Sequence, residues 1–157
     1  MALAEEFAGA RFAGFAELEL LRAQANEPSD TSATPTSFTA TWQKRAADSG
    51  ALLPLCVSVD VSLQTGRVWG YQAERGTYDG PTVPKIGEAQ ALQTAVAEAD
   101  KSPTWAEAVA SAPQLQVVRL NQGYKLVWIV EFENAARLLT DILVDALTGE
   151  VLNPLGS

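Results

Sequence analysis

Carboxylates are the side chains in this sequence best suited to catalysis. Glu131 and Glu133 lie two residues apart in a run typical of a strand, so they share one face at a separation of roughly 7 Å. That spacing fits an inverting acid–base pair or a weak cation site. Asp141 and Asp145 are four residues apart, roughly 13 Å in a strand, which is too far for such a pair. Solvated side chains at a strand end are the favoured interpretation of Glu131 and Glu133, so no catalytic residue is predicted.

The composition removes most other catalytic and metal-binding chemistry. The 157 residues include no His, which excludes a Ser-His-Asp triad, a Cys-His dyad and an imidazole metal site. Cys56 is the only cysteine, so neither an intrachain disulfide nor a thiolate cluster can form. It lies on the polar phase of a predicted strand, where a small filling side chain is favoured over a reactive thiol. The glycines form no phosphate-binding pattern. We therefore expect no cofactor and no metal.

The charge of the chain bears on its partners. It carries 11 Lys and Arg against 19 Asp and Glu, a net charge of −8, with a pI near 4.5. Such a protein lacks the cationic face that nucleic-acid backbones and anionic membranes require, so neither is predicted as a partner. No apolar run approaches the roughly 18–20 residues of a membrane-spanning helix. Met1 to Glu6 lack the basic and apolar regions of a signal peptide, which leaves open a cytoplasmic protein and one whose leader has been removed.

Two aromatic side chains are candidates for contact with a partner. Trp69 and Tyr71 fall on one phase of a predicted strand, opposite Val68 and Gly70. If the Val68 phase faces the helices, Trp69 and Tyr71 are exposed and form the best candidate contact surface. Most of the other large rings are expected between sheet and helix, where they supply apolar burial.

The N-terminal half is predicted to be one helix followed by antiparallel strands. Apolar residues at helical spacing cover residues 2–12, whereas residues 16–24 fit either a helix or a strand. The polar stretch 26–37, which contains two prolines, is predicted to be a surface loop or mobile connector. Period-two alternation then predicts the strands, which cover residues 38–43, 55–63 and 68–71.

The C-terminal half is also predicted to place helices before strands. A connector at 76–85 contains Gly and Pro, and a helix with an apolar stripe follows at 86–99. A second short helix is predicted at 104–112, because Thr104 and Glu107 have the spacing of a capping box and proline follows. The predicted strands cover residues 115–120, 124–133, 138–145 and 150–152. The two predicted domains are residues 1–75 and 86–157, on either side of the connector.

Two short turn sequences suggest that the halves are copies of one unit. The residues concerned are Asp60, Thr65 and Gly66 in the first half and Asp145, Thr148 and Gly149 in the second. The two glycines are 83 residues apart, and Trp42 and Trp128, upstream of them, are 86 apart. Glycine supplies a positive φ in a short hairpin, while Thr and Asp bond nearby backbone groups. All six residues are therefore predicted to be structural turn residues.

The C-terminal half resembles the PepSY domain, which occurs in propeptides of thermolysin-type proteases and in many bacterial envelope proteins. The resemblance covers about residues 85–152 and rests on the run Val144 to Val151, the strand before it and the helix that opens at Ile86. That helix reads Ile-Gly-Glu-Ala-Gln-Ala, where the family usually has Ile-Ser-x-x-Glu-Ala. The first half is similar, more weakly, to YcdB/YcdC-type repeats related to PepSY, or to a second PepSY-like unit.

The resemblance implies an α+β fold of two similar units, each an antiparallel sheet packed by an α-helix. It also implies a non-catalytic binding or regulatory module that contacts a peptidase or a cell-envelope component outside the cytoplasm. Such a partner would dock by strand addition at a sheet edge or by aromatic contact. Two alternatives stay open: a carboxylate-based hydrolase that uses Glu131 and Glu133, and a structural subdomain of a larger protein. The oligomeric state is not predicted.

Overall fold

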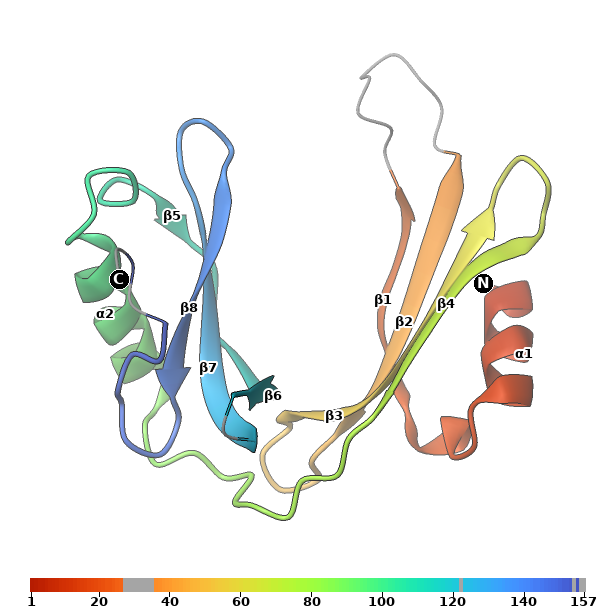
Figure 1. Cartoon of the computed structure of the whole chain (residues 1–157), viewed down its shortest axis with the longest axis horizontal. Helices are drawn as coiled ribbons and strands as arrows, with labels where there is room; N and C mark the ends of the chain where they lie inside the picture. The colour runs from red at the N-terminus through yellow and green to blue at the C-terminus, as the bar shows by residue number, and fades with distance from the viewer. Residues whose placement is uncertain (27–35, 122, 154, 156–157) are drawn as a thin grey trace. The chain divides into compact units, whose positions relative to one another are not determined.

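The computed structural model describes residues 1–26, 36–121, 123–153 and 155 (Figure 1). The chain divides into two compact units. Unit 1 consists of residues 1–45 and 53–77, and unit 2 consists of residues 46–52 and 78–157. Most of the loop predicted at 26–37 lies outside the described residues. Each unit is built from a helix and the antiparallel strands that follow it in the chain.

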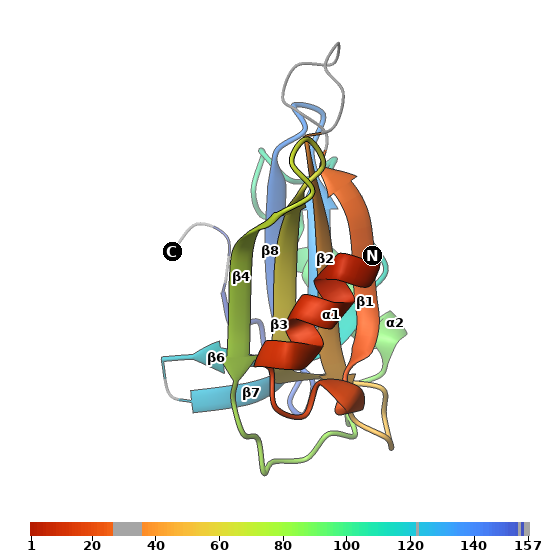
Figure 2. The ribbon, with the colours of Figure 1, turned by 90° about the vertical axis from the view of Figure 1, so that its right-hand side faces the viewer.

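Unit 1 is a helix followed by a four-stranded meander (Figure 2). Its elements are α1 (Ala2–Arg11), the 3-10 helix η1 (Phe15–Glu17), β1 (Glu19–Asn26), β2 (Ser37–Arg45), β3 (Leu52–Ser62, of which Leu52 belongs to unit 2) and β4 (Val68–Arg75). The strands lie in the order β1-β2-β3-β4, and α1 crosses one face of their sheet. The segment 16–24, which fitted a helix or a strand, is mostly β1 because it pairs along its length with β2.

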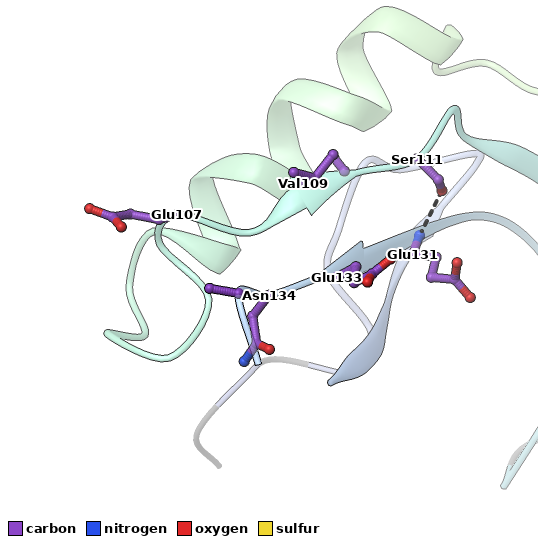
Figure 3. Close-up of a pocket in the computed structure, with 8 residues that line it drawn as sticks. Glu107, Val109, Ser111, Glu131, Glu133 and Asn134 are labelled. Atoms are coloured by element: carbon purple, nitrogen blue, oxygen red, sulfur yellow. Dashed lines mark hydrogen bonds between the residues drawn. The ribbon is translucent and has the colours of Figure 1, made fainter. Parts of the chain in front are cut away.

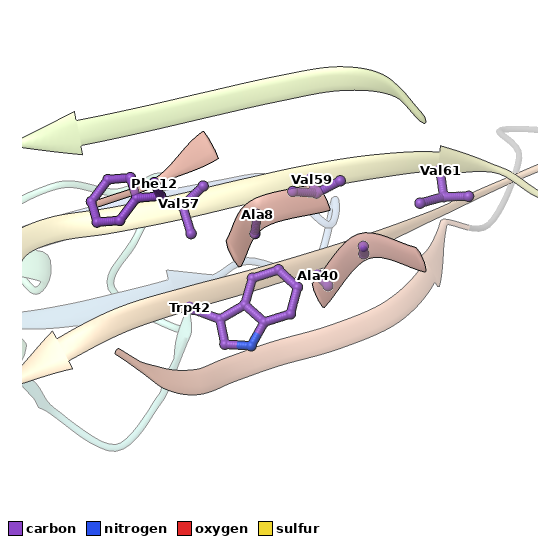
Figure 4. Close-up of a cluster of buried hydrophobic side chains, with 8 residues drawn as sticks. Ala8, Phe12, Ala40, Trp42, Val57, Val59 and Val61 are labelled. Atoms are coloured by element: carbon purple, nitrogen blue, oxygen red, sulfur yellow. The ribbon is translucent and has the colours of Figure 1, made fainter. Parts of the chain in front are cut away.

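The helix and the sheet of unit 1 close around one apolar core (Figure 4). Helix α1 contributes Ala4 and Ala8, which are fully buried and small enough to let the helix backbone approach the sheet closely. Alternate positions of β2 and β3 supply the sheet side of this core, as the period-two pattern predicted. The core side chains of the two strands are Ala40, Trp42, Val57, Val59 and Val61.

Unit 2 is a helix followed by strands arranged around β7. Its elements are α2 (Glu88–Ala99), β5 (Val109–Ala110), β6 (Gln114–Leu120), β7 (Gly123–Glu133) and β8 (Leu139–Asp145). Strand β7 pairs antiparallel with β5 and β6 along one edge and with β8 along the other. Leu126, Val127 and Trp128 in its middle are all buried, which confirms the prediction of a central strand from apolar residues on both phases. Helix α2 contacts β7 and β8.

The second short helix predicted at 104–112 is wrong. Residues 101–107 form turns, and Val109 and Ala110 form the short strand β5. The turns are stabilised by local hydrogen bonds, such as the one that the Trp105 N–H donates to the Ser102 carbonyl at 2.9 Å. From Val109 onward the backbone instead bonds to β7, so a ladder replaces the helical bonds that a capping box would have started.

The strand predicted at 150–152 is reduced to a single bridge between Val151 and Val144. Beyond it, the Asn153 side chain takes the place of a strand along β8. Its amide nitrogen donates to the Asp141 carbonyl at 2.7 Å, and its oxygen accepts from the Leu143 N–H at 2.6 Å. One side-chain amide therefore satisfies two backbone groups at the edge of the sheet.

Candidate functional site

Trp69 and Tyr71, the two aromatic contacts proposed from the sequence, are separated by a β-bulge. The β3–β4 ladder shifts register between Asp60 and Val61, and Trp69 is the extra residue on β4. An extra residue changes the phase of the strand, so a period-two count does not place both rings on one face.

The two rings accordingly have different surroundings. Trp69 is 66% exposed. Tyr71 pairs with the buried Val59, and its ring meets Phe7 of α1 edge-on with a centroid distance of 5.8 Å. Tyr71 therefore helps to hold α1 on the sheet, while Trp69 projects from β4 as an exposed aromatic side chain.

Strand β4 lies at the edge of the unit 1 sheet. In the described part of the chain, β3 is the only strand that pairs with β4. The stretch from Tyr71 to Arg75 is exposed throughout. Next to Trp69, a Cβ at Gly70 would collide with the Asp60 carboxylate, so a larger residue there would displace the Asp60 side chain.

Asp60, predicted to be a turn residue, lies in β3 and belongs to a chain of hydrogen bonds across the sheet. Asn26 Nδ2 donates to Thr39 Oγ1 at 2.8 Å, and that hydroxyl donates to Asp60 Oδ1 at 2.5 Å. The hydroxyls of Thr41 and Ser58 form a second cross-strand hydrogen bond at 3.1 Å. The polar phase of β2 and β3 is thus hydrogen-bonded within unit 1.

The two Thr-Gly turns each contain the same type of backbone hydrogen bond. Gly66 N–H donates to the Ser62 carbonyl at 2.9 Å, and Gly149 N–H donates to the Asp145 carbonyl at 2.8 Å. Both glycines have positive φ, 65° and 80°. The counterpart of Asp145 is therefore Ser62 rather than Asp60. Sequence reasoning missed this residue, although its spacing of four from the turn glycine is the same in both halves.

The first residue of each turn also bonds the turn backbone through its side chain. Ser62 Oγ accepts the Thr65 N–H at 3.2 Å. Asp145 Oδ1 accepts two such bonds, from the N–H groups of Leu147 at 2.9 Å and Thr148 at 3.1 Å. The carboxylate therefore satisfies one more backbone donor than the hydroxyl does.

Asp145 is buried and forms an ion pair with Lys125 at 3.3 Å. Burial by itself raises the pKa of this carboxyl. The Leu147 N–H, the Lys125 ammonium and the Thr148 N–H outweigh that effect, so its pKa lies below the usual value. Desolvation, followed by the charge of Asp145, raises the pKa of the Tyr78 phenol. Asp145 is therefore an ionised structural residue of the turn.

Glu131 and Glu133 line a hollow of about 510 Å³ at the β5–β7 end of unit 2 (Figure 3). The other lining residues are Glu107, Val109, Ala110, Ser111, Asn134 and Ala135. Figure 3 shows the Glu107 and Glu131 carboxylates at opposite ends of the hollow, pointing away from each other. Within the described ranges, no group of three or more Cys, Asp or Glu side chains is placed to hold a metal ion. The hydrolase alternative, which would use Glu131 and Glu133 as its two carboxylates, stays a prediction.

The geometry defines an α+β protein of helix-packed antiparallel strands. Solved structures share this fold, among them the Bacillus megaterium YpeB C-terminal domain, a PepSY-type domain, with a TM-score of 0.53. The likeness covers 94% of this chain and 59% of that chain at 19% sequence identity, which shows the fold alone. No family model and no curated protein matches the chain.

The comparison confirms the predicted α+β class, and the architecture is consistent with a PepSY-like fold. The chain spans about three fifths of the length of the YpeB structure. The tandem repeat in the N-terminal half stays a prediction. Among the described residues, no helix has the length and apolar character needed to cross a membrane.

Proposed function

We propose that this chain is a non-catalytic protein-binding module that takes up an extended segment of a partner at the β4 edge, with Trp69 as the anchoring side chain. One observation carries the proposal: an edge strand presents a large ring that is 66% exposed. Edge strands offer unpaired backbone groups, and extended segments bind them by adding a strand.

The strand beside Trp69 is held firmly enough to serve as a template. Val68 packs against the core of unit 1, and Tyr71 contacts Phe7. Further along, the Arg75 guanidinium lies 4.7 Å from the centre of the Phe12 ring. These contacts order β4, so a partner strand does not have to order it on binding.

Trp69 would supply much of the affinity. A tryptophan buries on the order of 150–250 Å², and tryptophan is enriched among the residues that dominate binding energy at interfaces. Because Trp69 is the extra residue of the bulge, its side chain does not follow the regular alternation of side chains along the strand. The proposal therefore separates two roles: backbone pairing along β4 and side-chain anchoring at Trp69.

The PepSY resemblance supports a partner of the thermolysin-type peptidase class or a component of the cell envelope. It also supports a location outside the cytoplasm, with a cytoplasmic location as the alternative. In this function the module restrains or assists the peptidase by occupying it and does not turn over a substrate itself.

The test uses a purified thermolysin-type peptidase and the full chain. Calorimetric titration is expected to show saturable binding, and Trp69→Ala is expected to weaken it by about tenfold or more because the anchor is lost. Leu63→Ala is the matched control, since Leu63 is also exposed in unit 1 but precedes β4. Trp69→Phe should retain most of the affinity.

Two results would contradict the proposal. The first is binding that Trp69→Ala leaves unchanged, which would move the contact surface elsewhere. The second is hydrolysis of a peptide substrate by the purified chain that Glu131→Gln/Glu133→Gln abolishes, which would support the hydrolase alternative.

A further inference from the structure

A second surface of the molecule, on the unit 2 sheet, has the features of a binding site. The β5–β7, β6–β7 and β7–β8 pairings align its side chains in three cross-strand rows. The rows are Val109–Glu133–Leu139, Ser111–Glu131–Asp141 and Gln114–Ile129–Leu143. These positions alternate along β7 and β8 with the buried Val130, Phe132 and Ile142, so they occupy the other face of the strands. We call the three rows the open face.

The open face carries an apolar patch. Val109 is 75% exposed and Leu139 is 60% exposed, and both flank Glu133 in one row. They are among the most exposed large apolar side chains of the described residues, and the neighbouring Leu138 is 54% exposed. Exposed apolar side chains grouped in this way and rimmed by polar residues are typical of interaction surfaces.

Like charges face each other in the middle row. Glu131 and Asp141 are direct cross-strand partners, and both are exposed. Opposed like charges destabilise a sheet, and a Lys or Arg placed beside them would remove the penalty. In the part of the chain that the structure describes, neither carboxylate forms an ion pair with a cation. The fold therefore tolerates an electrostatic conflict here that its own residues do not resolve.

The middle row also lies where two hollows meet. The hollow of about 510 Å³ beside Val109 and a second one of about 410 Å³ beside Ile129 share Ser111 and Glu131 among their lining residues. Among the described residues, no Lys or Arg lines either hollow. A ligand lying along β7 would therefore meet both apolar side chains and carboxylates, and no described Lys or Arg in either hollow would repel a cation.

We infer that the open face binds an extended, basic segment of a polypeptide, with Arg or Lys at alternate positions. Side chains two apart in an extended segment are separated by roughly 7 Å, the same spacing as Glu131 and Glu133 on β7. The aliphatic stems of Arg or Lys would cover Leu139 and Val109 while their charged ends reach the carboxylates. A single metal ion fits poorly, since the described carboxylates do not gather into a coordinating group.

The test is fluorescence anisotropy with the full chain and a labelled short peptide in which arginine alternates with valine and threonine. We expect saturable binding that weakens with added salt. Glu131→Gln/Asp141→Asn is expected to weaken it by about tenfold or more. The matched control is Glu5→Gln/Glu6→Gln, which removes the same charge from exposed positions of α1.

A second pair of variants tests the apolar patch, and a second peptide tests the spacing. Leu139→Ser should weaken binding, while Leu63→Ser, at a comparably exposed leucine of unit 1, should not. A peptide of the same composition with its arginines side by side should bind less tightly than the alternating one.

Three results would overturn the inference. One is absence of binding by the alternating peptide. Another is an equal loss in the Glu5→Gln/Glu6→Gln control, which would mean attraction to the net charge of the chain alone. The last is a saturable Ca²⁺ site, found by calorimetry and removed by Glu131→Gln/Asp141→Asn, in a chain that does not discriminate between the peptides. None of these results depends on Trp69, so the β4 proposal is tested separately.

Discussion

Each unit carries a cross-strand pair of polar side chains at the same distance in sequence from its Thr-Gly turn. The pair is Thr41 and Ser58 in unit 1, and Glu131 and Asp141 in unit 2. The side chains of the first pair attract each other, whereas those of the second pair repel each other. In both units the later residue of the pair lies four positions before the first residue of a Thr-Gly turn. The unit 1 pair is joined by a hydroxyl–hydroxyl hydrogen bond of 3.1 Å. The unit 2 pair sets two carboxylates directly opposite each other.

The difference shows that a pair of antiparallel strands can carry a polar face with internal partners or one without them. A hydroxyl pair satisfies itself, so that position of unit 1 gains little from an external ligand. A carboxylate pair has acceptors only and repels itself, so it gains from an external cation. Binding capacity therefore depends on side-chain chemistry at one row of the sheet more than on the fold.

The two turns differ in the same way, and their first residues provide the largest expected effect. Asp145→Ala leaves two turn N–H groups and Lys125 without the buried carboxylate, which should cost about 2–3 kcal/mol of unfolding free energy. Ser62→Ala removes one exposed hydrogen bond and should cost about 0.5–1 kcal/mol. Urea denaturation measures both. Equal losses would show that the turns are equivalent in energy as well as in backbone.

The backbone of these turns could be predicted from sequence because Gly66 and Gly149 are local signals of a turn with positive φ. The first residues of the turns, Ser62 and Asp145, could not be matched by residue identity, since a hydroxyl accepts a turn hydrogen bond in one and a carboxylate in the other. Asp60 has the same identity as Asp145 but lies in β3. Trp69 shows a second limit: alternation places it on one face of the strand with Tyr71, but a bulge separates the two rings, and a bulge is a tertiary feature that one strand does not reveal.

Elements with strong periodicity were predicted best. The order of residues in β3 shows directly which alternate positions face the core. The apolar residues on both faces in the middle of β7 are equally clear from its sequence. The error at 104–112 has a physical cause, because a capping box favours the start of a helix but does not supply a buried face for it. Pairing of Val109 with Glu133 across the chain offered the backbone a better partner.

Substitution of the turn glycines tests whether the two backbones are equivalent. Gly66→Ala and Gly149→Ala each force a Cβ into a left-handed conformation, at a cost of about 1–2 kcal/mol. The losses should be similar, because an added Cβ meets nothing within 4 Å at Gly66 and only ordinary contact with Ile86 at Gly149. A much larger loss at one glycine in thermal or urea denaturation would show that the turns differ in more than their side chains.

Acid should affect the unit 2 turn more than the unit 1 turn. The pKa of Asp145 is lower in the folded chain than its usual value, so its stabilisation is present above the unfolded pKa of about 3.9 and is lost as the pH falls through the folded pKa. Asp145→Asn should flatten the acid side of the stability–pH profile, while Ser62→Ala should leave its shape unchanged. The unfolding free energy lost when Asp145 is protonated should be smaller than the loss in Asp145→Ala, since a protonated carboxyl still accepts a hydrogen bond. A profile that Asp145→Asn does not alter would contradict the lowered pKa.

Substitutions in the two matching pairs are expected to have small effects of opposite sign. Glu131→Gln removes the repulsion with Asp141 and should raise the unfolding free energy by about 0.2–1 kcal/mol, even though it weakens the binding of a basic peptide. Thr41→Val breaks the bond to Ser58 and should lower the unfolding free energy by about 0.5–1.5 kcal/mol. Urea midpoints at low and high salt measure both, and salt should shrink the gain of Glu131→Gln because it screens the repulsion. A loss of stability in Glu131→Gln would mean that this carboxylate already has a favourable partner within the fold, and the open face would then have no unresolved charge to offer a ligand.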